Sequence, residues 1–516
     1  MAKKFTSTIA GASFLITVVG LIGRGLGLIR EVIFANFFGL NVEYDLYLVG
    51  AVLPITINTI ILYLGQNYFI PNYNKIKIES EEKVRRFTNS TFWLFVLGGI
   101  ILCAILFLFS QRIVELYLQN NSFSSVETTI TVFRIFILTI PFNAAASILS
   151  AYLQAEFEYK FPAYSQLLLN VAVIFLVIFF SSDWGILTIP LGYIWGSILQ
   201  AIYLLLKSKK VIRLNIIKLF HDKSVLIFIN LSFLLTVLIE SISQIYLLAD
   251  RYLFNEVDKG GIAALNYALN LFVLPISIIS VALSTALFPK LSRSYSENSH
   301  VELESSINSF FSMNVFLFVP ISIIFILYGD VIIKLLFQRG AFNVNDTLMT
   351  FEVIKIYSLS LIFYSSYVVI NKLLYSAEMV KQLLIITILG CVLKVVLNFA
   401  LVKSMQQQGL ALSSTLSYIF FFLASIFLVN KRLNINNKTL FVRELIFSIA
   451  NAAVSYYVSA LIGELNIFNN ATALELLKIV VFVAVYFTNG YLTEHKSFKL
   501  LYELFRNLKS VRIDNI

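Results

Sequence analysis

The chain has 516 residues, of which 59% are hydrophobic and 13% are charged, and its formal net charge is +10. A mean hydropathy of +0.84 excludes a soluble globular class and indicates a membrane protein that crosses the bilayer many times. The basic excess needs no nucleic-acid partner, because an anionic inner leaflet favours a basic cytoplasmic rim. The two cysteines, Cys103 and Cys391, stand inside apolar segments, so neither a disulfide framework nor a metal site is predicted.

In chain order, the apolar segments predict about fourteen transmembrane helices, because each approaches or exceeds the roughly 20 residues that span a bilayer. The expected fold is therefore an all-α polytopic membrane protein. No cleavable leader is predicted, since the first segment is too long for the apolar core of a signal peptide. The segments run over residues 8–38, 44–71, 90–110, 129–155, 160–181, 185–206, 225–249, 262–288, 306–327, 351–376, 382–402, 408–430, 442–463 and 474–493.

Lysine and arginine gather in alternate predicted loops. Loops 75–86, 207–223 and 431–443 are basic, and so is the tail after residue 496. The loops on the other side carry far fewer basic residues. By the positive-inside rule, we expect both termini in the cytoplasm.

The two halves of the chain share a pattern at a constant offset. The tripeptide Val-Leu-Pro at Val52 recurs at Val273, 221 residues later, and at the same offset Arg30 meets Arg251. Six predicted helices separate the matching positions. Because six is an even number, matching helices cross the membrane in the same direction, so parallel repeats are expected. Such repeats usually form two bundles around a central site.

The repeat predicts three regions. An N-lobe over 1–222 holds segments 1 to 6 and a basic loop, and a C-lobe over 223–433 holds segments 7 to 12. Segments 13 and 14 and the basic tail form an addition over 434–516.

The first apolar segment carries two arginines, Arg24 and Arg30, and Glu31 follows directly. A charge in the bilayer core costs from about 3 to more than 10 kcal/mol, so it usually faces a bundle interior or a water-filled cavity. Guanidinium groups stay charged and bind phosphate with two parallel hydrogen bonds, which indicates an anion site. The alternative is structural, with Arg30 reaching lipid headgroups and Arg24 paired with Glu31 or Asp45. The glycines that flank Arg24 are expected to loosen the helix and to let neighbouring backbones approach.

Two further ionisable residues lie in the middle of apolar segments, Glu240 in segment 7 and Lys394 in segment 11. A mutual ion pair would offset the burial of both charges, and a coupling-ion or proton site is the other interpretation. The histidines, His221, His300 and His495, fall in predicted cytoplasmic loops or the tail. A histidine proton relay inside the membrane is therefore not expected.

Sequence signals of catalysis are absent. The chain has no P-loop, and its predicted loops are too short to hold a soluble active site. We therefore expect a transporter that is not an enzyme and that needs no cofactor.

Three stretches carry a resemblance to a known family. They read GRGLGLIREVIFANFFGLNVEYDLYLVGAVLP from Gly23, LNYALNLFVLPISIISVALSTALFPKLS from Leu265 and LFQRGAFNVNDTLMT from Leu336. The ordered set is similar to the MurJ/MviN family of lipid II flippases, within the multidrug/oligosaccharidyl-lipid/polysaccharide exporter superfamily. The similarity spans segments 1 to 12, and fourteen segments is the count of that family.

The resemblance implies a two-lobed transporter with a cationic central cavity in the bacterial cytoplasmic (inner) membrane. Its members move undecaprenyl-diphosphate-linked sugars from the inner to the outer leaflet by alternating access, and segments 13 and 14 shape a groove for the lipid tail. Arg24 and Arg30 match arginines implicated in binding the diphosphate-sugar head, and Asp45 matches a family acid. Asn58 and Asn270 stand where the family commonly has arginines. The candidate substrate-binding residues are Arg24, Arg30, Glu31, Asp45, Asn58 and Asn270.

The leading hypothesis is a flippase for lipid II, because a diphosphate head is too costly to desolvate to cross hydrocarbon unaided. One alternative is a flippase for capsule, O-antigen or teichoic-type intermediates. A drug/cation antiporter is disfavoured by the two arginines, and a non-transporting cell-wall scaffold is the remaining class. The expected partners are a polyprenyl-diphosphate-linked glycan, membrane lipids and the cell-wall synthesis machinery.

Overall fold

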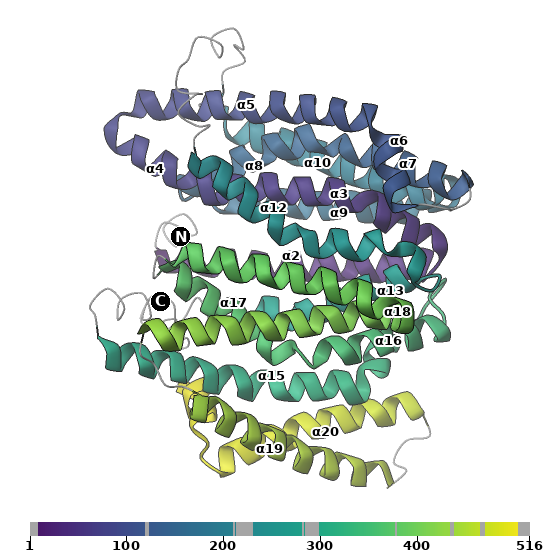
Figure 1. Cartoon of the computed structure of the whole chain (residues 1–516), viewed down its shortest axis with the longest axis vertical. Coiled ribbons are helices and arrows are strands. Elements are labelled where there is room, and N and C mark those ends of the chain that lie inside the picture. The colour runs from purple at the N-terminus through teal and green to yellow at the C-terminus, as the bar shows by residue number, and fades with distance from the viewer. Residues whose placement is uncertain are drawn as a thin grey trace. The chain divides into compact units, whose positions relative to one another are not determined.

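The computed structural model describes residues 9–118, 123–209, 212, 231–280, 283, 299–376, 379–433, 438–464 and 470–503. Every regular element within these residues is a helix (Figure 1). The all-α membrane fold predicted from the sequence is therefore confirmed.

The chain divides into two compact units. Unit 1 comprises Met1–Ala263 and Arg339–Asn343, and unit 2 comprises Ala264–Gln338 and Val344–Ile516. Helix α12 belongs to unit 1 because it packs against α3. The lobes inferred from the sequence repeat stay a prediction.

Unit 1 contains many helices that pack against helices that do not directly precede or follow them in the chain. Its elements are α2 (Ile9–Phe38), α3 (Val42–Leu64), the π-helix η1 (Gly65–Phe69), α4 (Ile70–Glu79), α5 (Glu81–Leu108), α6 (Ser110–Tyr117), α7 (Phe123–Ile137), α8 (Thr139–Ala155), α9 (Lys160–Trp184), η2 (Gly185–Leu187), α10 (Thr188–Lys207), α12 (Leu231–Tyr252) and η4 (Phe254–Glu256).

Unit 2 contains longer helices, several of which are bent. Its elements are α13 (Gly261–Pro275), whose first turn lies in unit 1, the π-helix η5 (Ile276–Ser280), α15 (His300–Phe337), α16 (Val344–Ser358), α17 (Leu361–Ser376), α18 (Val380–Leu433), α19 (Lys438–Glu464) and α20 (Ala471–Leu492).

By length and composition, nine stretches of the described residues could cross a membrane, or ten if the bent pair of α16 and α17 is one span. Two of them, Lys160–Lys207 and Lys381–Arg432, have 48 and 52 residues. At 1.5 Å per residue each would extend about 70 Å or more, over twice the hydrocarbon thickness of a bilayer. Each is therefore a helical hairpin, and the count of stretches is smaller than the count of crossings. The predicted total of about fourteen helices stays a prediction.

The hairpin in α18 turns at Gln406, where the backbone has φ +49° and ψ −129°. Lys394 donates from Nζ to Ser414 Oγ over 2.6 Å, and Ser413 donates to Asn398 Oδ1. Each pair joins a residue before the turn to one after it, so the two halves of α18 lie antiparallel.

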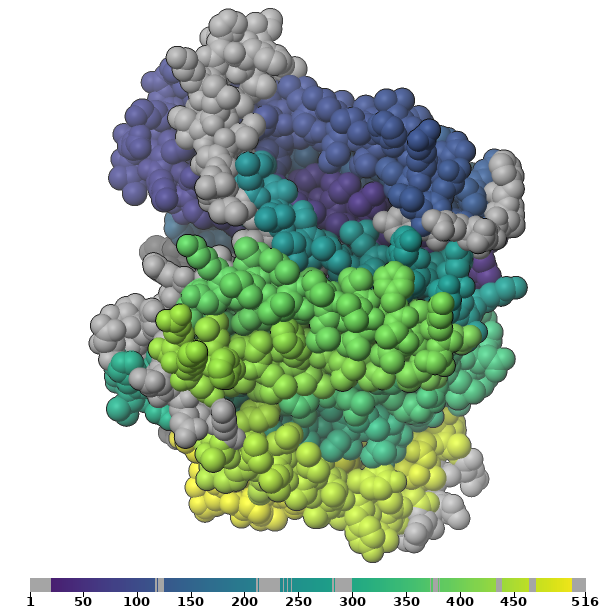
Figure 2. Space-filling view, viewed as in Figure 1, coloured from purple at the N-terminus to yellow at the C-terminus, as the bar shows by residue number. Residues whose placement is uncertain are grey.

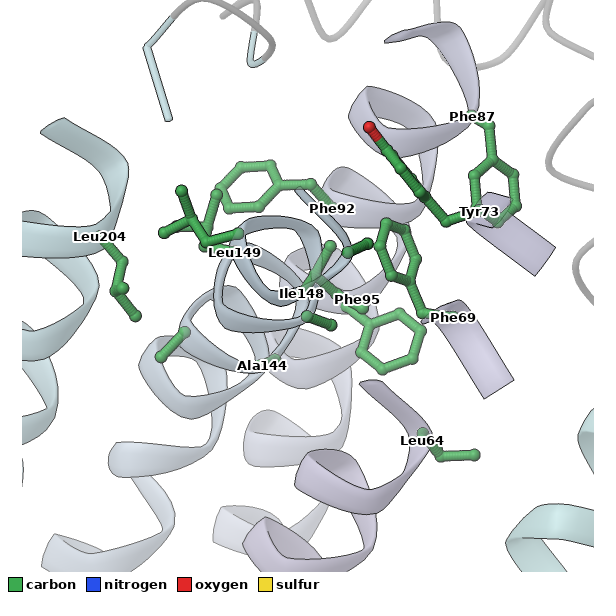
Figure 3. Close-up of a cluster of buried hydrophobic side chains, with 14 of the residues drawn as sticks. Leu64, Phe69, Tyr73, Phe87, Phe92, Phe95, Ala144, Ile148, Leu149 and Leu204 are labelled. Atoms are coloured by element: carbon green, nitrogen blue, oxygen red, sulfur yellow. The ribbon is translucent and has the colours of Figure 1, made fainter. Parts of the chain in front are cut away.

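One apolar cluster of unit 1 joins η1, α5 and α8 (Figure 3). Phe69 stacks on Phe87 with ring centroids 5.3 Å apart, and Ile148 and Leu149 are fully buried beside Phe95. Because lipid tails are as apolar as these side chains, close packing rather than exclusion from water holds such a cluster together.

Large apolar side chains also cover outer surfaces of both units, whose elements can be followed by colour in Figure 2. Phe179 on α9, Phe427 on α18 and Val480 on α20 are each at least 60% exposed. Exposure of this kind is unfavourable in water and suits helices that face lipid.

Candidate functional site

Helix α2 runs without a break through the two predicted arginines and packs against α9. Its C-terminal end is held by two glycine turns. Gly260 (φ +83°) and Gly340 (φ +55°) approach the carbonyl oxygens of Leu40 and Asn36 so closely that a Cβ atom would lie within 2.4 Å of them. The end of the helix that carries Arg30 is therefore held by backbone contacts that only glycine permits.

Arg30 lies at the centre of a polar cluster of unit 1. Its Nη2 is 2.7 Å from Glu31 Oε1, and its Nη1 donates to Asn170 Oδ1 over 3.2 Å. The Arg30 side chain is 20% exposed and that of Glu31 is 7% exposed. The guanidinium therefore forms an ion pair and an amide hydrogen bond well inside the helical bundle.

Two aromatic rings flank the same guanidinium. The Cζ atom of Arg30 lies 5.5 Å from the ring centroid of Tyr193 and 5.7 Å from that of Phe34. Cation–π attraction of this kind is stronger where the cation is desolvated. The Nε atom of Arg30 is buried and has no hydrogen-bond partner.

Two partners of Arg30, Asn170 and Tyr193, come from α9 and α10, which form a tight antiparallel hairpin. A Cβ atom at Gly192 would lie 2.8 Å from Val173 Cα, and one at Gly196 would lie 3.0 Å from the Leu169 backbone. Residues 192–196 read Gly-Tyr-Ile-Trp-Gly, a spacing that lets transmembrane helices approach closely. This motif was readable in the sequence, but sequence reasoning missed it and with it Asn170 and Tyr193.

Arg24 has a different environment, one turn and a half before Arg30. Its side chain is partly exposed, and no described residue forms a hydrogen bond or an ion pair with it. The proposed structural pairing of Arg24 with Glu31 or Asp45 is not formed: Glu31 pairs with Arg30, and Asp45 accepts hydrogen bonds from two backbone N–H groups. The expectation that the flanking glycines admit close neighbours is wrong: a Cβ atom at Gly25 or Gly27 would meet nothing within 4 Å.

Asp45 is fully buried near the N-terminal end of α3. Its two carboxylate oxygens accept hydrogen bonds from the backbone N–H groups of Gly260 (2.6 Å) and Ala263 (2.7 Å). Asp45 therefore caps the first turn of the helix that begins at Gly261. Its role in substrate binding stays a prediction.

The two asparagines that stand at family arginine positions lie on different helices. Asn58 on α3 donates from Nδ2 to Thr139 Oγ1 over 2.8 Å, and its Oδ1 is buried without a partner. Asn270 lies on α13 and is half-buried. Neither replaces the positive charge of an arginine.

Glu240 and Lys394 each have a partner of their own. Glu240 on α12 accepts a hydrogen bond from Asn67 Nδ2 over 3.0 Å, and Asn67 belongs to the π-helix η1. Lys394 is fully buried and donates to Ser414 and to Asn398. An ion pair between Glu240 and Lys394 stays a prediction.

The two histidines that the structure describes, His300 and His495, belong to unit 2. His300 begins α15, and His221 lies outside the described residues. His495 follows α20, stacks on Phe447 with ring centroids 3.8 Å apart, and places Nε2 3.3 Å from Glu444 Oε2. Burial lowers the pKa of His495, and the nearby Glu444 carboxylate offsets part of this effect. Within the described residues, no group of three or more His, Cys, Asp or Glu could hold a metal ion.

A hollow of about 660 Å³ lies on the surface of α19 in unit 2. Its walls are almost wholly apolar, and Arg443 is the charged residue among them. The lining residues are Thr439, Val442, Arg443, Ile446 and Phe447.

A family model described as lipid II flippase MurJ matches residues 34–483. The chain belongs to the lipid II flippase MurJ family. The resemblance seen in the sequence is thereby confirmed over most of the chain, and MurJ membership agrees with a multi-pass membrane protein of a transporter family.

Curated MurJ relatives match at similar length. The probable lipid II flippase MurJ of Buchnera aphidicola subsp. Acyrthosiphon pisum is 27% identical over 418 residues, which cover 80% of this chain and 82% of the relative. The probable lipid II flippase MurJ of Thermotoga maritima is 25% identical over 471 residues, which cover 90% of this chain and 93% of the relative.

Solved structures share the fold. A lipid II flippase MurJ in an inward closed conformation superposes with a TM-score of 0.77 at 22% identity, over 96% of this chain and 99% of that one. An inward-facing multidrug resistance transporter of the MATE family superposes with a TM-score of 0.67 at 13% identity, over 81% of this chain and 98% of that one. Both solved structures therefore share the fold of this chain.

Proposed function

We propose that this chain is a lipid II flippase, which moves undecaprenyl-diphosphate-linked peptidoglycan precursor from the inner to the outer leaflet by alternating access. The observation that carries the proposal is the family match over residues 34–483, together with relatives of matching length that are named for this function.

The chemistry of the head group supports the same function. A diphosphate loses its hydration shell on entering hydrocarbon, and burial of an unpaired charge costs far more than burial of a paired one. Arg30, with its guanidinium inside unit 1, supplies a fixed positive charge that can replace the lost water. A device of this kind needs no covalent chemistry.

Arg24 and Arg30 are assigned different parts in this function. Arg24, which is partly exposed and has no polar partner in the described residues, is the guanidinium that is ready to meet an anion. Arg30 already holds Glu31 and Asn170, so an anion reaches it by exchange for Glu31. Asn58 and Asn270 supply amide contacts to the sugar portion instead of charge.

The polyprenyl tail needs an apolar surface beside the path of the head group. The hollow on α19 has walls of this kind, and Arg443 at its edge suits an anionic lipid. We assign the tail to this face of α19.

The location and partners follow from the substrate. Lipid II is made at the cytoplasmic face, so the chain belongs in the cytoplasmic membrane with both termini in the cytoplasm, and the cell-wall synthesis machinery takes its product. Glu240 and Lys394 are candidates for coupling substrate movement to an ion or to membrane potential, because both are ionisable groups within apolar helices.

The test is complementation of a bacterium depleted of its own MurJ, combined with a leaflet-resolved measurement of lipid II. We expect the wild-type chain to restore growth and to move lipid II to the outer leaflet. Arg30→Ala is expected to abolish complementation, and Arg24→Ala is expected to reduce transport at least tenfold, with normal amounts of protein in the membrane. Full complementation by both variants would exclude the proposed role of the arginines, and lipid II retained in the inner leaflet with wild-type protein would exclude the function.

A further inference from the structure

The hydrogen-bonding state of Arg30 differs from that of an ordinary structural arginine. A guanidinium has five N–H donors, and buried donors in proteins are nearly always paired. Arg30 uses one donor on Asn170 and one on Glu31, while its buried Nε has no partner. This arrangement orients the guanidinium but leaves the buried Nε–H donor unpaired. The unpaired donor points to a ligand that accepts a hydrogen bond from it.

Asn170 is itself held in one orientation. Its Nδ2 donates to the backbone carbonyl of Gln166 over 3.3 Å, which turns Oδ1 toward Arg30. Because the amide is neutral, it orients the guanidinium without cancelling its charge. Glu31, in contrast, is an anion that competes with any phosphate for the same guanidinium.

Tyr193 packs beside the guanidinium of Arg30. Its ring lies 5.5 Å from Arg30 Cζ and also contacts Phe136, with ring centroids 5.0 Å apart. The position of Tyr193 is set by Gly192 and Gly196, which bring α10 against α9. A planar cation beside a ring that is itself held by its neighbours has fewer orientations available to it.

We infer that Asn170 and Tyr193 are positioning residues that hold the Arg30 guanidinium ready for the diphosphate of the lipid-linked substrate. This inference rests on the proposed function. In it, the diphosphate takes the place of Glu31 at Nη2, while Asn170 and Tyr193 keep their contacts before and after the exchange. Preorganisation of this kind increases affinity because less freedom is lost on binding.

The test measures lipid II binding and flipping by the purified full-length protein in lipid vesicles. Asn170→Ala and Tyr193→Leu are each expected to raise the half-saturating concentration of lipid II about tenfold, since a contact to a charged group is lost. Tyr193→Phe keeps the ring and is expected to recover most of the affinity. Glu31→Gln removes the competing charge, so tighter binding with slower turnover is expected.

A matched control lies two turns along α10. Gln200 donates to Ser165 Oγ over 3.2 Å, another buried polar contact between α10 and α9. Gln200→Ala is expected to bind lipid II as the wild type does. In an Arg30→Ala background, Asn170→Ala and Tyr193→Leu are expected to have no further effect on binding.

The outcomes separate the two claims. If wild-type protein binds and flips lipid II but Asn170→Ala and Tyr193→Leu bind it normally, the positioning role is excluded and the function stands. The positioning role also fails if Asn170→Ala and Tyr193→Leu weaken binding as much in the Arg30→Ala background as they do in the wild-type protein. The two substitutions would then act through the fold and not through Arg30. If the wild-type protein neither binds nor moves lipid II, the proposed function fails as well.

Discussion

Single residues of one chemical type have different roles in this chain, and their partners decide which. Arg24 and Arg30 lie on one helix, but Arg30 is enclosed by Glu31, Asn170 and two rings, whereas Arg24 has no polar partner among the described residues. Asp45 is an acid within an apolar helix that binds two backbone N–H groups. A charged residue in an apolar segment is therefore unusual, but its position in the sequence does not show what its role is.

Asp45 provides a test of a structural role at the residue scale. Asp45→Ala leaves the N–H groups of Gly260 and Ala263 without their acceptor, so we expect a loss of about 1–3 kcal/mol in stability. Asp45→Asn keeps one carbonyl acceptor and should lose less. Thermal unfolding of the purified variants measures this difference. A normal unfolding temperature for Asp45→Ala together with lost lipid II transport would instead favour direct substrate binding.

At the scale of elements, the glycines of α2 and those of α10 differ in how closely a second helix approaches them. Gly25 and Gly27, close to Arg24, face open space, whereas Gly192 lies against the backbone of Val173. The first set leaves room along α2, and the second brings α9 and α10 together. Only contacts with a second helix distinguish the two cases.

The two kinds of glycine give a matched pair of substitutions. Gly192→Ala places a Cβ atom 2.8 Å from Val173 Cα, so the helices must separate, and we expect a loss of about 1–3 kcal/mol. Gly25→Ala meets no neighbour within 4 Å and should be neutral or slightly stabilising, since alanine favours helix. The unfolding temperatures of both variants in detergent decide this, and an equal effect at the two positions would contradict the contact described for Gly192.

The turn of the α18 hairpin supplies a second prediction at this scale. Gln406 has φ +49°, a conformation that costs a residue other than glycine about 1–3 kcal/mol. We expect Gln406→Gly to stabilise the protein by about 1 kcal/mol. Gly409→Ala is the control, because its Cβ atom would lie 2.6 Å from Leu401 O and should destabilise the same turn. A lower unfolding temperature for Gln406→Gly would be the contrary result.

For the whole molecule, two groups outside the spans link stability to pH. Burial by itself would raise the pKa of Glu156, but hydrogen bonds from Lys77 and Tyr73 outweigh burial and hold that pKa below its ordinary value. Burial lowers the pKa of His495. Both groups bind protons less readily in the folded protein than in the unfolded chain, so both contributions are present at neutral pH and decrease as pH falls.

We therefore expect the unfolding temperature to fall on acidification. The contribution of His495 decreases below about pH 6.5, and that of Glu156 decreases below about pH 4.5, the ordinary values of the two groups. His495→Phe keeps the stack on Phe447 and removes the titrating group, so its unfolding temperature should vary less between pH 7 and pH 5. A steeper dependence in that variant would show that His495 is not responsible.

The sequence by itself determined the class of the protein, its apolar segments, its family and the two arginines of the first helix. These features are local: a run of apolar residues spans a bilayer whatever it packs against, and the arginines belong to a contiguous motif. The tertiary structure decided which partners each charge meets. Asn170 lies 140 residues from Arg30, and its contact depends on how closely α9 and α10 approach. Such contacts arise from the packing of helix surfaces that are far apart in the chain, so the residues near Arg30 in the sequence do not predict them.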